Sequence, residues 1–358
     1  MRTIKIDSVQ PEDEKIEEAT TLLKNGKIVA FPTDTVYGLG VNAEDKEATD
    51  RLYEVKKRPR DKPFVLFLEK KEDFIRFAEV IPLFAQKLVN KFWPGPLTLL
   101  FKASKTSPSS LVSKQGKIGM RFPSHPIPQN IMKEGKFLLA VTSANLSGKA
   151  KPLSPKEIKK TFDKETELLL DGGETLFGEE SSIVDVTSSP PCLVREGWLS
   201  KKQIEETWAK KKDILFVCTG NTCRSPMAES ILKKMWPERE SEIKIHSAGT
   251  AALTGGRSTP LAIKMMREKG VGINLHRSTP LAKKLIKKAD LILVMEGRHK
   301  KEVLNISPLA EGKVFLLKDF ALGLKEEILD PMGNSEERYQ KCIREIEESI
   351  RGLISRIA

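Results

Sequence analysis

FVCTGNTCRSP, from Phe216 to Pro226, is the stretch that decides how the second half of the chain folds. The mostly apolar run at residues 213–217 predicts a buried strand, and a helix is expected to begin near Pro226. Cys218 and Arg224 lie on either side of the short loop between them. Backbone N–H groups of a loop that opens a helix point toward a common space, and the helix N-terminus adds partial positive charge. The stretch therefore predicts an oxyanion-binding loop.

A thiol and a guanidinium beside such a loop suit chemistry on a phosphoryl group. The positive field of the loop should lower the pKa of the Cys218 thiol and make it a nucleophilic thiolate. Arg224 can hold two oxygens of a bound phosphoryl group at once, because its guanidinium is planar and presents paired donors.

The rest of the second half predicts a parallel α/β sheet. Apolar strand signals recur at residues 242–246, 291–295 and 314–317, and helical segments separate them. Continuous apolar strands that alternate with helices are typical of a doubly wound sheet covered on both faces. The cysteine loop then lies at the C-terminal end of the first strand, where such folds bind ligands.

Length and charge limit the class of protein. The chain has 358 residues, which predicts two domains, and the basic run before the cysteine strand places them at residues 1–209 and 210–358. The formal net charge of +12 favours acidic partners such as nucleic acid, nucleotides or phosphoproteins. A lysine-rich surface without any such partner explains the same charge equally well.

The cysteines and the N-terminal segment indicate a cytoplasmic protein. The 4 cysteines show no repeated C-x-x-C pattern of a metal site, and the chain is not a small disulfide scaffold. The first residues lack the apolar core of a secretion signal, and no apolar run approaches the length of a bilayer span. We therefore expect a reducing compartment and no membrane partner.

The second half resembles the low-molecular-weight protein tyrosine phosphatases from about residue 212 to the end. The motifs that carry the resemblance are VCTGNTCRSPMAE (217–229), HSAGT (246–250), INLHRS (273–278), ADLILVM (289–295) and DPMG (330–333). The resemblance implies a four-stranded parallel sheet and a reaction that needs no metal.

The same resemblance assigns roles to three residues. Cys218 would attack phosphorus and form a phosphocysteine, Arg224 would stabilise the equatorial oxygens, and Asp330 would protonate the leaving group and then activate water. It also assigns the loop and its supporting side chains, which are Thr219, Gly220, Asn221, Thr222, Cys223, Ser225, Ser247 and His276.

Three alternatives remain open for the substrate of the second half. CTGNTCRSPMAE looks most like the bacterial protein arginine phosphatase branch, and the hydroxyl of Thr222 suits a polar guanidinium better than a phenyl ring. We favour phosphoarginine over phosphotyrosine on this ground. A thioredoxin-coupled arsenate reductase is disfavoured, because no Cys occurs between Arg224 and Lys341 to relay electrons. Cys223 could form a reversible disulfide with Cys218 that protects the nucleophile.

Several weaker signals occur together in the first half. PTDTVYGLG (32–40) combines hydroxyls with glycines, KKRPRDKP (56–63) is a basic run stiffened by proline, and SANLSG (143–148) follows an apolar strand. Short polar residues at the end of a strand are where α/β proteins build sites. No Gly-Lys pair continues into Ser or Thr, so a Walker A loop is excluded.

Together with WPGPLT (93–98), MRFP (120–123), SSIVD (181–185) and REG (195–197), these motifs resemble the YrdC-type threonylcarbamoyl-AMP synthases over residues 5–208. The resemblance implies a twisted mixed sheet with helices. It also implies synthesis of threonylcarbamoyl-AMP from L-threonine, bicarbonate and ATP, with release of pyrophosphate, for the t6A modification of tRNA.

The resemblance distributes the site residues over two substrates. The threonine site would contain Thr35, Arg121 and Ser181. ATP, together with Mg²⁺ that accompanies it, would meet Lys56, Arg58, Lys62, Ser143, Asn145 and Arg195. No protein side chain is assigned as a metal ligand.

One position departs from the family pattern. Many members carry a His where this chain has Phe67, which puts one threonine contact in doubt. An alternative for the first half is an RNA-binding module, as its positive charge allows. On either interpretation tRNA and the proteins of the t6A machinery are candidate partners, and the expected protein is bifunctional.

Overall fold

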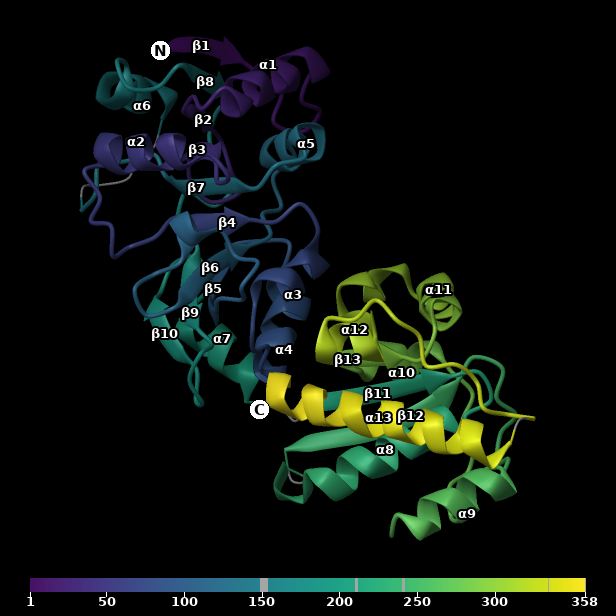
Figure 1. Cartoon of the computed structure of the whole chain (residues 1–358). Helices are drawn as coiled ribbons and strands as arrows, with labels where there is room; N and C mark the ends of the chain where they lie inside the picture. Colours follow the sequence, from purple (N-terminus) through teal and green to yellow (C-terminus); the bar gives the residue numbers. More distant parts are fainter. Residues whose placement is uncertain (149–153, 210–211, 240–241, 334, 358) are drawn as a thin grey trace. The chain divides into compact units, whose positions relative to one another are not determined.

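The structure is a computed structural model that describes residues 1–148, 154–209, 212–239, 242–333 and 335–357. These residues form two compact units, shown in Figure 1. Unit 1 comprises Met1–Val80 with Lys91–Thr207, and unit 2 comprises Ile81–Asn90 with Trp208–Ala358. The division of the chain into domains 1–209 and 210–358 stays a prediction.

Unit 1 is built on a mixed sheet, as the sequence predicts. Its described strands form a 10-stranded sheet in the order β1-β8-β2-β3-β7-β4-β6-β5-β9-β10. Parallel pairs such as β1–β8 and β5–β9 alternate with antiparallel pairs such as β3–β7 and β5–β6. The strand bounds are β1 (Arg2–Lys5), β2 (Val29–Phe31), β3 (Gly38–Asn42), β4 (Val65–Phe67), β5 (Leu97–Lys102), β6 (Lys117–Arg121), β7 (Leu139–Ser143), β8 (Leu168–Asp171), β9 (Ser182–Asp185) and β10 (Cys192–Arg195).

Helices cover this sheet through apolar stripes. In α1 the side chains of Ile16, Ala19 and Leu23 recur at helical spacing and are buried. The helices in this part of the chain are α1 (Asp13–Lys24), α2 (Lys46–Lys56), η1 (Lys71–Asp73), α3 (Phe74–Phe77), α4 (Leu83–Phe92), η2 (Ser109–Leu111), α5 (Pro126–Gly135), α6 (Pro155–Phe162) and α7 (Lys201–Trp208). Residues 83–90 of α4 belong to unit 2 and not to the unit that contains this sheet.

The glycines of PTDTVYGLG have a packing role that the sequence did not predict. Its GLG portion begins strand β3, which pairs with β2. A Cβ at Gly40 would lie 2.6 Å from a ring carbon of Phe31, so only glycine fits there.

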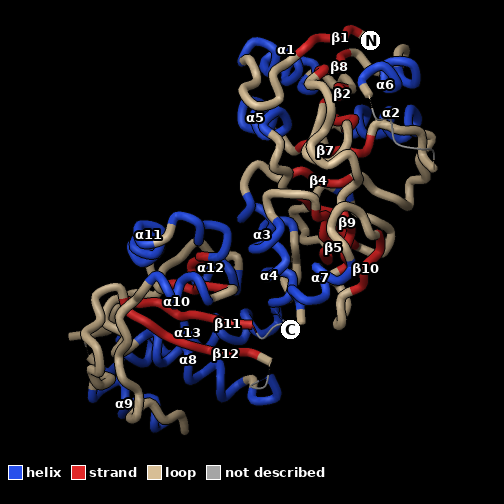
Figure 2. The backbone as a smooth tube through the Cα atoms, turned by 180° about the vertical axis from the view of Figure 1, so that it is seen from behind, coloured by secondary structure: helices blue, strands red, loops and turns tan. Residues whose placement is uncertain are grey.

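Unit 2 is a doubly wound parallel sheet, which confirms the prediction. Its described strands form a 4-stranded sheet in the order β12-β11-β13-β14, and every pair is parallel. Leu215 and Val217 of β11 pack with Ile286 of α10 and Val303 of α11. Figures 1 and 2 show α8 and α13 along the opposite face. The bounds are β11 (Lys212–Cys218), α8 (Arg224–Met235), η3 (Pro237–Arg239), β12 (Ile243–Gly249), α9 (Pro260–Glu268), α10 (Lys283–Lys288), β13 (Leu291–Val294), α11 (Gly297–Ile306), η4 (Pro308–Lys313), β14 (Val314–Leu316), α12 (Leu317–Leu322) and α13 (Glu336–Ile357).

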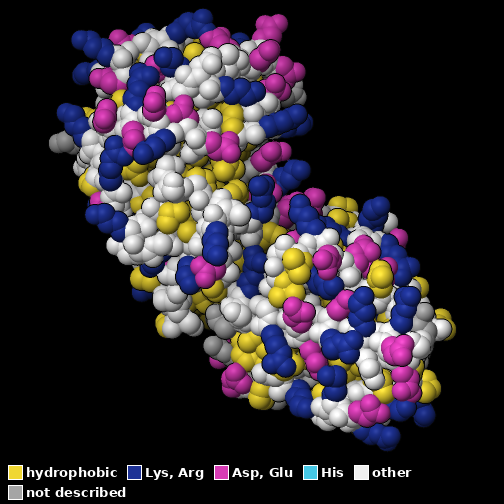
Figure 3. Space-filling model, viewed as in Figure 1, with side chains coloured by type: hydrophobic (Ala, Val, Ile, Leu, Met, Phe, Trp, Pro, Cys, Tyr) yellow, Lys and Arg dark blue, Asp and Glu magenta, His cyan; other side chains and the backbone are white. Residues whose placement is uncertain are grey.

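The surface carries both signs of charge. Figure 3 shows Lys and Arg side chains dispersed among acidic ones on the face that it displays. Within the described residues, no helix combines the length and the apolarity that a bilayer span requires.

Candidate active sites

The first candidate site is the loop between β11 and α8. β11 ends at Cys218 and α8 begins at Arg224, so the loop lies at the C-terminal edge of the parallel sheet, as predicted. The Cys218 side chain is buried, and its Sγ lies 3.0 Å from Oγ of Ser225. A thiol inside a closed loop, beside a hydroxyl donor, has the arrangement of a stabilised nucleophile.

Asn221 holds the loop in its closed shape. It is fully buried with a φ of 52°, a left-handed conformation that Asn adopts more readily than most residues. Its Nδ2 donates to Ser225 Oγ and to Ser247 Oγ, both at 2.9 Å, and its carbonyl oxygen lies 2.8 Å from His276 Nε2. The structure therefore brings together the supporting residues that the sequence assigned to the loop.

Arg224 is held between two carboxylates. Its side chain is 1% exposed and forms ion pairs with Glu296 and Asp330. It also donates to the Ile328 carbonyl at 2.9 Å. The buried Arg224 Nε has no hydrogen-bond partner among the described residues, which leaves a donor for an incoming anion.

Glu296 was missed from the sequence. It follows strand β13 directly, at the same edge of the sheet as the cysteine loop. A carboxylate just after a buried strand is the signal that could have identified it.

The electrostatics of Cys218 correct one expectation. The loop was expected to lower the pKa of this thiol, but burial raises it and outweighs the Ser225 hydrogen bonds and the charge of Arg224, which lower it. The expectation was wrong because burial of the thiol disfavours its charged form by more than the loop and Arg224 favour it.

Replacing Glu296 with glutamine should lower the pKa of Cys218. The substitution removes a negative charge from Arg224, so the guanidinium should stabilise the thiolate more strongly. Inactivation by iodoacetamide at pH 7 should then be about three- to tenfold faster than in the wild type, which corresponds to roughly half to one pKa unit. The measurement is the inactivation rate of the phosphatase as a function of pH.

Glu302→Gln is the matched control, because Glu302 is exposed on the same helix, α11. Its inactivation profile should match that of the wild type. A profile for Glu296→Gln that is unchanged, or shifted to higher pH, would contradict the proposed influence of Glu296 on the thiol.

The two remaining loop residues that bear on the sequence interpretation are Thr222 and Cys223. Thr222 is half-buried, and its carbonyl accepts a hydrogen bond from the Thr259 backbone at 3.1 Å. Cys223 Sγ lies 3.2 Å from Thr259 Oγ1 and 3.6 Å from Tyr339 Oη. Cys218 and Cys223 are both free thiols in this structure, so the protective disulfide stays a prediction.

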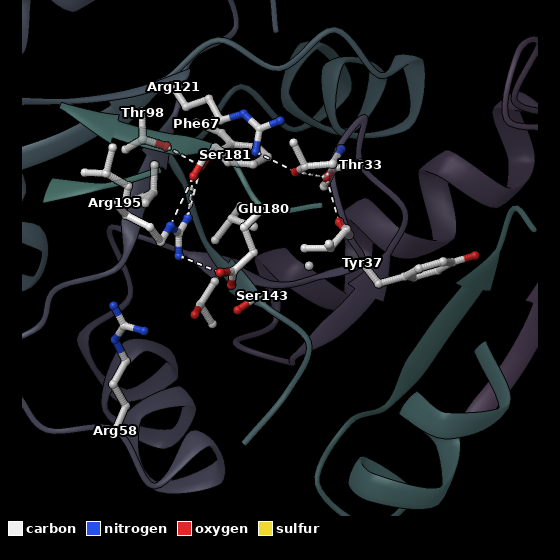
Figure 4. Close-up of a pocket in the computed structure, with 17 residues that line it drawn as sticks. Thr33, Tyr37, Arg58, Phe67, Thr98, Arg121, Ser143, Glu180, Ser181 and Arg195 are labelled. Carbon is white, nitrogen blue, oxygen red and sulfur yellow. Dashed lines mark hydrogen bonds and ion pairs between the residues drawn. The ribbon is translucent and has the colours of Figure 1, made fainter. Parts of the chain in front are cut away.

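The second candidate site is a pocket in unit 1 with about 570 Å³ of space, part of it open to solvent. It lies where β3, β6, β7 and β9 come together, and Figure 4 shows its lining. The structure brings six of the predicted residues to this pocket: Thr35, Arg58, Arg121, Ser143, Ser181 and Arg195. The lining also includes Phe67, the position that departs from the family pattern.

Arg121 is fixed at one side of the pocket. It is 4% exposed, and its Nη2 forms a 2.6 Å ion pair with Asp34. Its Nη1 donates to Thr35 Oγ1 at 2.8 Å, and its Nε donates to the Gly95 carbonyl at 3.0 Å. The Thr35 hydroxyl and the Arg121 guanidinium are thus held together in a fixed arrangement that a polar ligand can bind.

Arg195 reaches the pocket from the end of β10. It donates through Nη2 to the Ser181 carbonyl at 2.8 Å and forms a 2.9 Å ion pair with Glu180. Glu180 also lines the pocket and was missed from the sequence, although it directly precedes the SSIVD motif. Tyr37 points away from these groups in Figure 4 and bonds the Gly173 carbonyl at 2.7 Å.

Arg58 adds a second cation. Figure 4 shows it extending from the end of α2 with its guanidinium turned toward that of Arg195. Burial lowers the pKa of Arg58, and the charge of Arg195 lowers it further. Two arginines within electrostatic reach of each other create a field that favours a polyanion. Lys62 is exposed outside this lining and contributes its carbonyl to Arg58 Nε at 2.6 Å.

Lys56 lies outside the pocket lining but bonds the backbone of Ser143, which is part of the lining. Its side chain is buried, and its Nζ donates to the carbonyls of Ser143 and Asn145 and, at 3.1 Å, to Asn145 Oδ1. Neither Lys56 nor Asn145 is part of the lining. Burial, with a smaller contribution from the charge of Arg58, lowers the pKa of Lys56 to about 7.

The free energy of unfolding should therefore rise with pH in a way that depends on Lys56. Between pH 7 and an unfolded pKa of about 10.4, the unfolded chain binds more protons than the folded chain, so stability increases with pH. Lys56→Met lacks this titration and should gain less stability than the wild type between pH 7 and pH 9.5. Urea unfolding of both proteins at the two pH values measures the difference, and equal gains would contradict it.

Comparison with known proteins gives two family matches. The Sua5_yciO_yrdC family model, described as "Telomere recombination", matches residues 21–197. The model of the low molecular weight phosphotyrosine protein phosphatases matches residues 213–358.

Individual relatives also match either the first half or the second half of the chain. A threonylcarbamoyl-AMP synthase of Pyrococcus abyssi is 40% identical over 54% of this chain, and the chain spans only 57% of that relative. A putative threonylcarbamoyl-AMP synthase of Methanocaldococcus jannaschii is 34% identical over 55% of the chain and 93% of its own length. A protein-arginine-phosphatase of Bacillus subtilis is 39% identical over 40% of the chain and 96% of its own length.

Proposed function

The chain belongs to the Sua5/YciO/YrdC family over its first half and to the low molecular weight phosphotyrosine protein phosphatase family over its second, and on this premise we propose that it is a bifunctional enzyme. Unit 1 makes threonylcarbamoyl-AMP from L-threonine, bicarbonate and ATP. Unit 2 hydrolyses a phosphorylated protein side chain. The working environment is the cytoplasm, and tRNA with the t6A machinery receives the first product.

The observation that supports the synthase is the convergence of three arginines on one pocket. Arg121 with Thr35 provides a place for the carboxylate and hydroxyl of threonine. Arg58 and Arg195 line the same pocket and would bind the phosphates of ATP, which brings Mg²⁺ with it. Transfer of the adenylyl group leaves negative charge on departing pyrophosphate, and these cations stabilise that charge.

The phosphatase proposal rests on the placement of Cys218 beside Arg224 and Asp330. The Cys218 thiolate attacks phosphorus, the bond to the leaving group breaks, and a phosphocysteine forms. When the phosphoryl oxygens bind Arg224, Asp330 is released from its ion pair, takes up a proton from solvent and donates it to the leaving atom. Asp330 then removes a proton from the water that hydrolyses the phosphocysteine.

Phosphoarginine is the substrate that we favour. The half-buried Thr222 places a small polar side chain in the loop, where a bulky aliphatic residue would suit a phenol. The similarity to an arginine phosphatase of Bacillus subtilis supports the same choice.

Two assays on the purified full-length chain test these proposals. Pyrophosphate release that requires both threonine and bicarbonate is expected of the synthase, and salt-dependent tRNA binding without such release would favour the RNA-binding alternative. Hydrolysis of matched phosphoarginine and phosphotyrosine peptides tests the second half. A strong preference for phosphotyrosine would overturn the choice of substrate.

A further inference from the structure

An exposed aromatic pair lies beside the unit 1 pocket. The rings of Phe177 and Trp198 stack with centroids 4.6 Å apart and an angle of 26° between their planes. Trp198 is nevertheless 47% exposed. Stacking on Phe177 occupies one side of the indole, and nearly half of the Trp198 side chain stays open to solvent.

Backbone hydrogen bonds attach both residues to segments that border the pocket, since Glu180 lines it and Asp34 lies between the lining residues Thr33 and Thr35. The N–H of Phe177 donates to the Asp34 carbonyl at 3.0 Å, and the N–H of Trp198 donates to the Glu180 carbonyl at 3.0 Å. On either side of Trp198, the N–H groups of Gly197 and Leu199 donate to Ser182 Oγ at 3.0 and 3.1 Å. The aromatic pair is therefore attached to the pocket rather than placed on a free loop.

The pair is also connected to the cations of the pocket. The same Glu180 whose carbonyl binds the Trp198 backbone forms an ion pair through its carboxylate with Arg195. A flat π-surface at the border of a pocket that Arg58 and Arg195 line matches a ligand that joins an aromatic ring to a chain of phosphates. Among the proposed substrates, threonine and bicarbonate have no ring, so ATP is the one that fits.

We propose that the exposed side of Trp198 stacks against the adenine base of ATP, while Phe177 supports the indole and Arg58 and Arg195 receive the phosphates. This inference rests on the proposed synthase function. It assigns base recognition to an aromatic surface and phosphate recognition to charge, so the two contributions can be separated by experiment.

The test is calorimetric titration of the full-length chain with ATP and with inorganic triphosphate, which lacks the base. Trp198→Ala should raise the Kd for ATP about 5- to 150-fold, the range for loss of one base-stacking contact. The Kd for triphosphate should stay unchanged. Trp198→Phe should restore most of the affinity for ATP, because it keeps an aromatic face.

Leu176→Ala is the matched control, since Leu176 is 73% exposed next to Phe177 but offers no aromatic face. It should bind ATP as the wild type does. If it weakens ATP binding as much as Trp198→Ala, the surface acts as a general apolar patch for a protein partner and the inference is wrong.

Two other results are decisive. Equal ATP affinity of wild type and Trp198→Ala, or equal loss of ATP and triphosphate binding, would overturn base stacking while leaving the synthase proposal standing. A wild-type chain that binds no ATP at all would instead refute the synthase proposal. Should Trp198→Ala fail to fold, quenching of wild-type tryptophan fluorescence by ATP but not by triphosphate is the expected result, and its absence in the presence of bound ATP would count against stacking.

Discussion

Cys218→Ser should abolish the phosphatase activity and leave the synthase activity intact. A serine hydroxyl fits the space of the buried thiol beside Ser225 but ionises far less readily, so no competent nucleophile forms. We expect hydrolysis of p-nitrophenyl phosphate to fall by roughly 10⁴-fold or more, as is typical when a covalent nucleophile is removed. Pyrophosphate release that depends on threonine should be unchanged, because the pocket of unit 1 contains no residue of the cysteine loop.

Cys192→Ser provides the matched control. Cys192 is an exposed free thiol on β10, and its replacement should leave hydrolysis unaffected. Loss of both activities in Cys218→Ser would contradict independent sites. Retention of hydrolysis in Cys218→Ser would remove Cys218 from the role of nucleophile.

The phosphatase half was readable from the sequence because its site follows from the sheet. Parallel strands end at one edge, so a motif after the first strand and polar residues after later strands must lie near each other. This rule placed the loop with Cys218 and Arg224 at that edge. Asp330 follows no strand and was assigned by the family resemblance alone, and the structure pairs its carboxylate with Arg224. The same rule places Glu296 at this edge, but a single glutamate after an apolar run does not by itself indicate a functional residue.

The electrostatic state of the loop could not be predicted in the same way. The pKa of Cys218 depends on how far burial offsets Arg224 and the loop hydrogen bonds, and the extent of burial exists only in the folded chain. The sequence indicates which charges are present, but their compensation is a property of packing.

In unit 1 the motifs identified the pocket but not the task of each residue. Lys56 belongs to the basic run at residues 56–62, yet its ammonium is turned inward to the carbonyls of Ser143 and Asn145. The run extends from the last residue of α2 into the following loop, and its spacing does not show which of its cations turns inward. The packing role of the GLG portion of β3 could not be predicted, because the close approach of Gly40 to Phe31 is made across strands.

Arg121→Met should destabilise unit 1 and abolish the synthase activity. The substitution leaves the buried Asp34 carboxylate without its guanidinium partner, since both side chains are at most 5% exposed. Removing one member of a buried ion pair typically costs about 3–5 kcal/mol of unfolding free energy. Urea unfolding followed by tryptophan fluorescence measures this loss. Arg51→Met is the control, because Arg51 pairs with Glu167 at a side-chain exposure of 38% and such pairs contribute only about 0–1 kcal/mol.

A double variant separates the structural and the functional contributions of Arg121. Adding Asp34→Leu to Arg121→Met removes the unpaired buried charge, so the double variant should recover much of the lost stability. It should not recover pyrophosphate release, because the guanidinium that bonds Thr35 at 2.8 Å and faces the pocket is still absent. Recovery of activity along with stability would mean that Arg121 acts only as a partner of Asp34, and the assignment of Arg121 to the threonine site would then be wrong.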